Sequence, residues 1–413
     1  MKLQSSLLLT FFIFLSVAFA STNYKSKDKE GIQITTICKI GETAIANAND
    51  SRYTGLREPN AIITAKGTLV VVFGPHDIDA KNDRAHQDIL CRTSSDNGKT
   101  WNDTYRIMDK GMESILPTAL IYDEEKDKIL LLVNVIFNAP ERNDPLGKNT
   151  PCEHFVLSST DEGKTWSEPK AILKNEPGIT VFGGGNGIQL KSGKHKGRLL
   201  VPGGIGPNGA NQGIFISDNH GDSWSFVARE NMKGNTEATC SEIENGEIIF
   251  SWRKQKSSFS PTISFSSNGG QTISESEATL PDVWAGCNNS LLSINYHGKS
   301  AILYSGPLGP VNATKYELEQ NAKDVKSGTA DFYTTARSNG GAFISFDKGK
   351  NWNGKCIAKG WSFGYNVCVQ FPDGDIGVIF EGIPPDTKNV KNKGWDKKKL
   401  GIYLAKFSPK ILL

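Results

Sequence analysis

The pattern S-x-[D/N]-x-G-x-[S/T/N]-W is repeated along this chain, and the repetition restricts the fold more than any other feature of the sequence. The five copies are residues 94–101, 159–166, 217–224, 266–273 and 345–352, and the fourth ends in isoleucine instead of tryptophan. Asp or Asn at the third position is expected to hydrogen-bond the backbone two residues on, and glycine supplies the positive φ of such a hairpin turn. The tryptophan is expected to pack between sheets, where burial of its large apolar area stabilises the fold most.

Apolar or alternating runs precede every copy, which predicts a strand, a turn and a strand five times over. The runs are residues 89–92, 155–157, 213–216, 262–265 and 341–344. Successive copies are 65, 58, 49 and 79 residues apart, and such intervals suit a four-stranded sheet repeated radially as the blade of a β-propeller. The content of 42 Gly, 8 Trp and 20 Phe agrees with an all-β class. The motif predicts blades and by itself says nothing about chemistry.

The first 20 residues have the pattern of a signal peptide. Lys2 precedes an apolar stretch from Leu7 to Ala20, and small residues at 18 and 20 suit a signal peptidase, with an uncleaved anchor as the alternative. Residues 21–413 are then expected to form one propeller domain, secreted or at the cell surface. No later stretch has the length of apolar sequence that a membrane span needs. The net charge of +3 gives no reason to expect nucleic acid, and the seven cysteines fix no disulfide pairing.

Three arginines stand where predicted strands meet loops. Arg57 lies in residues 55–62, Arg253 ends the predicted strand 247–253, and Arg337 lies one strand ahead of the last turn motif. These positions before equivalent strands predict that the three side chains converge on the propeller axis around one anion. Guanidinium groups stay charged and bind carboxylate oxygens through two parallel hydrogen bonds.

With these contexts the chain resembles the sialidase (neuraminidase) family of exo-glycosidases over essentially the whole mature sequence. Leu56-Arg57-Glu58-Pro59 is similar to the family's Phe/Tyr-Arg-Ile-Pro signature, and residues 183–190 and 197–202 resemble a further stretch of its middle blades. The turn motif resembles the Asp-box, which many unrelated propellers also contain. The resemblance implies an all-β, six-bladed β-propeller with Asp-box turns, acting on sialylated glycoconjugates without a metal or another cofactor.

The resemblance also implies how the substrate carboxylate is held. Arg57, Arg253 and Arg337 match the arginine triad of the family. Glu381, in residues 377–382, matches the acid that orients the first of these arginines.

The implied nucleophile is Tyr365, in residues 363–367, and the implied base partner is Glu237, in residues 235–240. A tyrosine suits this role because the anomeric carbon of a sialoside bears a carboxylate, which would repel an anionic nucleophile. A phenol has an unperturbed pKa of about 10, so it needs a base within hydrogen-bonding distance. Sialidases differ in this way from the usual glycosidase pair of two carboxylates.

The implied acid/base lies in the loop before the first turn motif, where Asp83 fits best and Asp79 is the second choice. Two features depart from the family. Glu58 replaces an apolar residue, and residues 73–77 lack an arginine that contacts ring hydroxyls in many members, a role for which Lys81 or Arg84 are candidates. These departures concern the fine specificity for the substrate more than the activity.

The leading hypothesis is therefore a retaining exo-α-sialidase that releases terminal sialic acids. A close variant is a trans-sialidase, which needs an acceptor site that the sequence does not reveal. A propeller that binds glycans or a protein without catalysis is a second class. An unrelated Asp-box glycosidase is a third class, and it predicts paired catalytic carboxylates in place of an arginine triad.

Overall fold

The computed structural model describes most of the chain, and the following account concerns this part alone. The described residues are 25–27, 31–41, 45–46, 53–77, 86–137, 152–172, 181–182, 185–205, 211–228, 237–253, 261–275, 287–309, 337–385 and 399–413. They form strands β1 to β26 and one short 3-10 helix, η4 (Pro409–Leu412). Within these ranges no helix has the length and apolar character needed to cross a bilayer.

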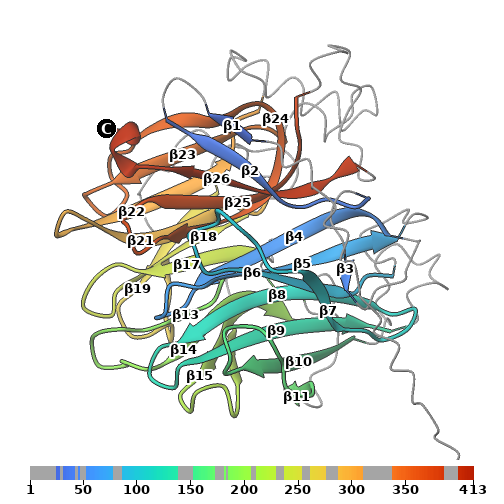
Figure 1. Cartoon of the computed structure of the whole chain (residues 1–413). Helices are drawn as coiled ribbons and strands as arrows, with labels where there is room; N and C mark the ends of the chain where they lie inside the picture. Colours follow the sequence, from blue (N-terminus) through green and yellow to red (C-terminus); the bar gives the residue numbers. More distant parts are fainter. Residues whose placement is uncertain are drawn as a thin grey trace, which may run out of the picture.

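Most of the strands pair antiparallel with the strands that precede and follow them in the sequence (Figure 1). Blade 1 contains β4 (Tyr53–Ile63), β5 (Leu69–Asp77), β6 (Ile89–Ser94) and β7 (Thr104–Met108), with the short β3 (Ile45–Ala46) beside β7. Blade 2 contains β8 (Ser114–Asp123), β9 (Lys128–Ile136), β10 (Cys152–Ser159) and β11 (Lys170–Ile172). Blade 3 contains β12 (Val181–Phe182), β13 (Ile188–Gln189), β14 (Leu199–Ile205), β15 (Asn211–Ser217) and β16 (Ser225–Ala228). Blade 4 contains β17 (Ala238–Glu242), β18 (Ile248–Trp252), β19 (Thr262–Ser266) and β20 (Ser274–Glu275).

The remaining eight strands form one sheet that divides into two blades within a single long strand, β24 (Asn353–Gln370). Its first part pairs with β23 as the outer strand of blade 5, and its last part pairs with β25 as the first strand of blade 6. Blade 5 also contains β21 (Ser290–Tyr296), β22 (Lys299–Pro307) and β23 (Ser338–Ser345). Blade 6 also contains β25 (Ile376–Ile383), β26 (Gly401–Phe407) and β2 (Gln33–Cys38), with β1 (Lys25–Lys27) beside β2.

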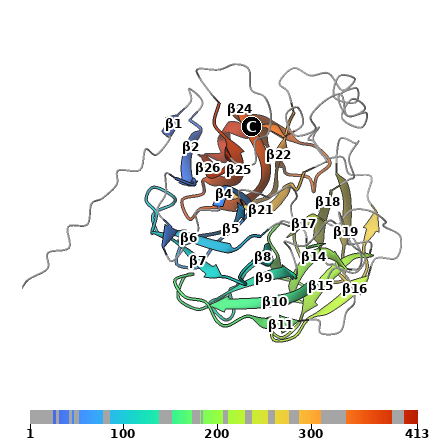
Figure 2. The same ribbon diagram turned by 90° about the vertical axis from the view of Figure 1, so that its right-hand side faces the viewer.

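The six blades form a closed ring. The first strands β4, β8, β13, β17, β21 and the last part of β24 contact one another in this order, and β24 then contacts β4 again. Figure 2 shows the sheets arranged around this central axis. The described residues contain six buried apolar clusters, and each cluster lies between two neighbouring blades. The prediction of an all-β, six-bladed propeller is confirmed.

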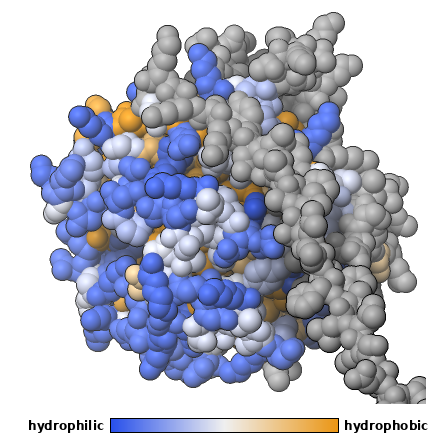
Figure 3. Space-filling view, viewed as in Figure 1, coloured by the Kyte–Doolittle hydropathy of each residue, from blue (hydrophilic) through white to orange (hydrophobic). Residues whose placement is uncertain are grey.

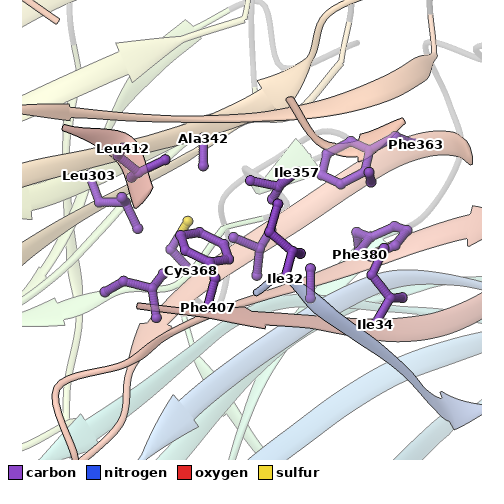
Figure 4. Packing of buried hydrophobic residues seen from close by; sticks show 14 of the residues in the cluster. Ile32, Ile34, Leu303, Ala342, Ile357, Phe363, Cys368, Phe380, Phe407 and Leu412 are labelled. Atoms are coloured by element: carbon purple, nitrogen blue, oxygen red, sulfur yellow. The ribbon is translucent and has the colours of Figure 1, made fainter. Parts of the chain in front are cut away.

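Blade 6 closes the ring with strands from both ends of the chain. β2 pairs antiparallel with β26, so Gln33 lies opposite Lys406 and Thr35 lies opposite Leu404. In Figure 4, Ile32 and Ile34 from the N-terminal region lie in the same apolar cluster as side chains of blades 5 and 6. This closure explains why five turn motifs serve six blades, since the third and fourth strands of blade 6 are not consecutive in the sequence.

The turn motifs join the third and fourth strands of blades 1 to 5. In the first copy, Asp96 Oδ1 accepts hydrogen bonds from the N–H groups of Lys99 (3.0 Å) and Thr100 (2.8 Å), and Ser94 Oγ accepts one from Gly98 N–H (2.9 Å). The bond to the residue four positions on recurs at Asp161, Asn219, Asn268 and Asp347. The expectation of a bond two residues on is wrong, because the side chain spans a wider turn that has the glycine at its centre.

The aromatic ends of the turn motifs lie between blades, as predicted. Trp101 packs against the cluster between blades 6 and 1, and Trp166 packs against the cluster between blades 1 and 2. Trp224, Ile273 and Trp352 do the same at the next three blade interfaces. Each turn motif therefore fastens its own blade to the preceding one.

The described residues also include buried thiols and a few exposed apolar side chains. Cys91, Cys240, Cys287 and Cys368 are buried free thiols. The face in Figure 3 is mainly hydrophilic where it is coloured, and large exposed apolar side chains among the described residues are Met112, Phe346 and Leu413. Apolar residues scattered singly on a protein surface are normal.

Candidate active site

The arginines, Glu237, Tyr365 and Glu381 gather at one end of the ring. Arg57 lies within β4, the first strand of its blade, whereas Arg253 follows β18, a second strand, and Arg337 precedes β23, a third strand. The prediction that the three arginines precede equivalent strands is therefore wrong. They meet because antiparallel first, second and third strands share one blade end, where the first strand begins and the second ends.

Glu381 lies at the centre of the first group of contacts. Its carboxylate accepts hydrogen bonds from Arg57 Nε (3.3 Å), from the Glu58 N–H (2.9 Å) and from the Tyr365 N–H (3.2 Å). Arg337 Nη1 lies 3.6 Å from the same carboxylate. The side chain of Glu381 is 0% exposed and those of Arg57 and Arg337 are 2% exposed, so this is a buried ion cluster. Buried charges need such partners, because desolvation is otherwise too costly.

Tyr365, Glu237 and Arg253 form the second group. The Tyr365 hydroxyl donates a hydrogen bond to Glu237 Oε1, and Arg253 Nη1 lies 2.9 Å from the same hydroxyl oxygen. Arg253 Nη1 also contacts Glu237 Oε2 at 2.5 Å. Glu237 and Arg253 are brought together by the β17–β18 hairpin, in which the Arg253 N–H donates to the Glu237 carbonyl (2.9 Å). The phenol oxygen thus has a base on one side and a cation on the other.

The Tyr365 ring lies among the arginines. The Cζ atoms of Arg57 and Arg337 are 5.3 and 5.0 Å from the ring centroid, within cation–π distance. Burial and then the charge of Glu237 raise the pKa of Tyr365 well above its ordinary value, against the opposing effect of the arginines. Burial alone would lower the pKa of Arg253, but the neighbouring Glu237 outweighs it and raises this pKa. Tyr365 is therefore a neutral phenol at pH 7, next to a carboxylate that can take its proton.

Three β-bulges shape this end of the ring. The β4–β5 pairing shifts between Arg57 and Asn60, and the β23–β24 pairing shifts between Ser338 and Gly341. The β24–β25 pairing shifts between Phe363 and Asn366, so Tyr365 lies inside the third bulge. Bulges bend a strand and redirect its side chains, and they are frequent next to functional sites. Each bulge lies at or beside one of the predicted site residues.

The acid/base prediction lies outside the described residues. Asp83, its alternative Asp79, and the candidates Lys81 and Arg84 all fall between residues 77 and 86. On the C-terminal side of this segment, the fully buried Asp88 accepts a hydrogen bond from the Tyr53 hydroxyl and lies 3.2 Å from Arg106 Nη1. Burial raises the pKa of Asp88. Asp88, directly before β6 of blade 1, is therefore held in place by two side-chain contacts.

Glu58 has a role in this region that the sequence does not reveal. Glu58 has a φ of 59°, and its N–H group is one of the hydrogen-bond donors to the Glu381 carboxylate. Its side chain accepts a hydrogen bond from Gln87 Nε2 (3.4 Å). No sequence pattern marks a glutamate for this left-handed conformation, which asparagine, aspartate and glycine adopt more readily. The departure from the family signature therefore coincides with a strained turn of the backbone.

The charges of the site favour an anion. Three guanidinium groups face the carboxylates of Glu237 and Glu381, so these five side chains carry a net positive charge. Arg253 is 25% exposed and Glu237 is 13% exposed, so the second group of contacts is the part open to solvent. In the described ranges, no three His, Cys, Asp or Glu side chains gather as metal ligands would. A partly buried cationic site with a phenol and an adjacent base is the kind of site that binds a carboxylate and performs nucleophilic chemistry.

Comparison with known proteins places this propeller in a family. The model of the BNR repeat-like domain matches residues 79–378, which is well over half of the chain. The chain therefore belongs to the BNR repeat-like domain family, and its assignment to the sialidases is confirmed by the relatives that follow.

Two curated relatives are bacterial sialidases. The chain is 24% identical to the sialidase of Bacteroides fragilis over 369 residues, which is 82% of this chain and 62% of the relative. It is 26% identical to the sialidase of Micromonospora viridifaciens over 358 residues, covering 80% of this chain and 50% of the relative. The chain thus spans less than two thirds of the length of these relatives.

Solved structures share the fold. A Hadza microbial sialidase aligns with a TM-score of 0.68 at 20% identity, over 89% of this chain and 68% of that chain. The intramolecular trans-sialidase from Ruminococcus gnavus, solved with oseltamivir carboxylate, aligns with a TM-score of 0.64 at 18% identity, over 91% of this chain and 99% of that chain. At these identities the likeness shows the propeller fold.

Proposed function

We propose that this chain is a retaining exo-α-sialidase that hydrolyses terminal sialic acids from glycoproteins, glycolipids and oligosaccharides. The observation that carries the proposal is the Tyr365 hydroxyl, which donates to Glu237 and lies 2.9 Å from Arg253 at the edge of an arginine cluster. A nucleophile next to its base, with cations that suit a carboxylate nearby, matches the chemistry of a sialoside.

The arginines perform the binding step. Arg57, Arg253 and Arg337 would hold the substrate carboxylate, while Glu381 keeps the first and third of them in place. Bidentate guanidinium–carboxylate pairing would fix both the position and the orientation of the sugar.

The chemical step then has two halves. Asp83 would protonate the glycosidic oxygen as the bond from it to the anomeric carbon breaks. The Tyr365 oxygen bonds to that carbon and passes its proton to Glu237. In the second half, Asp83 takes a proton from water, whose oxygen displaces the Tyr365 oxygen, and Glu237 returns the proton to the phenolate. Two displacements at one carbon restore its original configuration.

The site of action is also a proposal. The apolar segment from Leu7 to Ala20 supports a signal peptide over residues 1–20, with secretion or display at the cell surface. Residues 21–413 would then form the catalytic propeller domain. Sialylated glycoconjugates are the proposed partners.

The test is release of 4-methylumbelliferone from its α-N-acetylneuraminic acid glycoside, with EDTA present. We expect turnover by the wild type and a loss of at least a hundredfold in kcat for Tyr365→Phe, since the nucleophile is removed. Tyr403→Phe is the matched control, because Tyr403 is a buried tyrosine of the same blade outside the site. Activity of Tyr365→Phe equal to the control would refute the assigned nucleophile.

Product analysis separates hydrolysis from transfer. NMR of the first product would show the α-anomer if configuration is retained. One of the structural relatives is an intramolecular trans-sialidase, so mass spectrometry should also look for an anhydro sugar. A product lighter than free sialic acid by one water would replace hydrolysis with intramolecular transfer at the same site. Binding of sialic acid without turnover would favour a non-catalytic propeller.

A further inference from the structure

Asn339 lies two residues after Arg337, in the second of the three bulges. Its φ is 55°, and it is 5% exposed. Among residues with a side chain, asparagine and aspartate adopt this left-handed conformation most readily, since a short polar side chain can bond locally. The position therefore favours asparagine for its backbone, and the side chain is free to serve a second purpose.

The side-chain amide of Asn339 joins two separate backbone segments. Its Nδ2 donates to the Gly309 carbonyl (2.8 Å), just beyond β22, and its Oδ1 accepts from the Gly360 N–H (2.7 Å), within β24. Its own carbonyl accepts from the Leu308 N–H (2.7 Å). A residue that only donates or only accepts cannot make both side-chain bonds. Asparagine here satisfies a buried acceptor, the Gly309 carbonyl, and a partly buried donor, the Gly360 N–H, together.

These bonds meet the strand that carries Tyr365. Gly360 lies where β24 passes from blade 5 to blade 6, and Phe363 N–H donates to the Arg337 carbonyl (2.9 Å). The segment of Arg337 is thus tied to β24 on both sides of the residues that cross between the blades. The Arg337 guanidinium carbon lies 5.0 Å from the centroid of the Tyr365 ring, which follows Phe363 by two residues on β24.

We propose that Asn339 is a positioning residue that holds Arg337 and Tyr365 in register for substrate binding and attack. The inference rests on the proposed function, which gives those two side chains their roles. Without the Asn339 amide, the Gly360 end of β24 and the Arg337 segment would move relative to each other. We expect kcat/KM to fall at least tenfold, through both a higher KM and a lower kcat, because one of the two residues binds and the other reacts.

The test compares Asn339→Gly with Asn245→Gly. Glycine keeps the left-handed backbone and removes both side-chain bonds. Asn245 has a φ of 52° and is exposed in the β17–β18 turn at the opposite blade end, so its variant controls for the change in backbone entropy. Asn339→Asp keeps the acceptor for Gly360 and loses the donor to Gly309, and it serves if the glycine variant does not fold. We expect its kcat/KM to fall at least tenfold as well, because a carboxylate oxygen then faces the buried Gly309 carbonyl oxygen.

Hydrogen–deuterium exchange of the folded proteins provides a readout besides activity. We expect faster exchange of the Gly360 and Phe363 amides in Asn339→Gly and no change there in Asn245→Gly. An active wild type, together with an Asn339→Gly variant that keeps its kcat/KM, would overturn the inference and leave the proposed function intact. A loss of kcat/KM without faster exchange would also overturn it. A wild type without turnover would refute the proposed function. Exchange alone would then decide whether Asn339 holds β24 in place.

Discussion

Replacing Glu381 by glutamine tests the buried ion cluster most directly. The variant keeps the size of the side chain and removes the charge that faces Arg57 and Arg337, both 2% exposed. Removing one partner of a buried ion pair costs about 3–5 kcal/mol, because the other charge stays in a poorly solvated place. One oxygen also becomes an NH₂ group, which faces N–H donors from Glu58, Tyr365 or Arg57.

We therefore expect the free energy of unfolding to fall by about 3–5 kcal/mol in Glu381→Gln. Urea titration followed by tryptophan fluorescence measures this as a lower midpoint with an unchanged slope. The KM for the fluorogenic sialoside should rise at least tenfold, since the arginines that bind the carboxylate lose their support.

Glu237→Gln is the matched comparison. Glu237 and its partner Arg253 are 13% and 25% exposed, so the lost charge is less deeply buried than that of Glu381 and the free energy of unfolding should fall by less than in Glu381→Gln. Its kcat should nevertheless fall by about 10²–10⁴, the usual contribution of a general base. A Glu381→Gln variant with a stability within about 1 kcal/mol of the wild type and an unchanged KM would refute this account of the cluster.

Further measurements test the turns, the strained residue and a buried thiol. Burial alone would raise the pKa of Asp96, but hydrogen bonds led by those from Thr100 lower it. The contribution of the Asp96 carboxylate to stability is therefore present above pH ~4 and lost as the pH falls further. Asp96→Asn should show a flatter fall of the urea midpoint from pH 5 to 2, and equal slopes would contradict this. Glu58→Gly should be more stable than Glu58→Ala by about 1 kcal/mol, because glycine relieves the φ of 59°, and a more stable alanine variant in the same titration would argue against strain. Burial raises the pKa of Cys91 to about 12. The contribution of its neutral thiol to stability is therefore complete below pH ~8.5 and lost as the pH rises toward 12. Cys91→Ala should weaken this alkaline fall of the urea midpoint, and an identical profile would show that the thiol stays protonated.

The sequence was sufficient to predict the blades, because their determinants are local. Each turn motif contains its own acceptor and its own glycine, so the copies around Asp96 and Asp347 report the same local geometry wherever they occur. The tryptophans follow from their size and apolar area. The family resemblance identified six site residues that the structure brings together, and the roles assigned to them remain predictions.

The sequence did not predict how the strands pair around the site. The bulges at Glu58, Asn339 and Tyr365 arise from the register between strands, and that register depends on packing across the ring. For the same reason the arginines were expected on equivalent strands, whereas they occupy a first, a second and a third strand. The double use of β24 is hidden too, because the sequence does not show that one 18-residue strand pairs with β23 in its first part and with β25 in its last part.

The closure of blade 6 determines how the ring resists a pulling force. β2 begins beside the end of β26, since Gln33 lies opposite Lys406, so the chain enters and leaves this pair of strands at the same end. A force applied between Gln33 and Phe407 would load the ladder one hydrogen bond at a time, in the unzipping direction rather than in shear. Tension at the termini would therefore open the ring at a low force, at the β2–β26 pair, while the strand pairs within blades 1 to 5 stay unloaded.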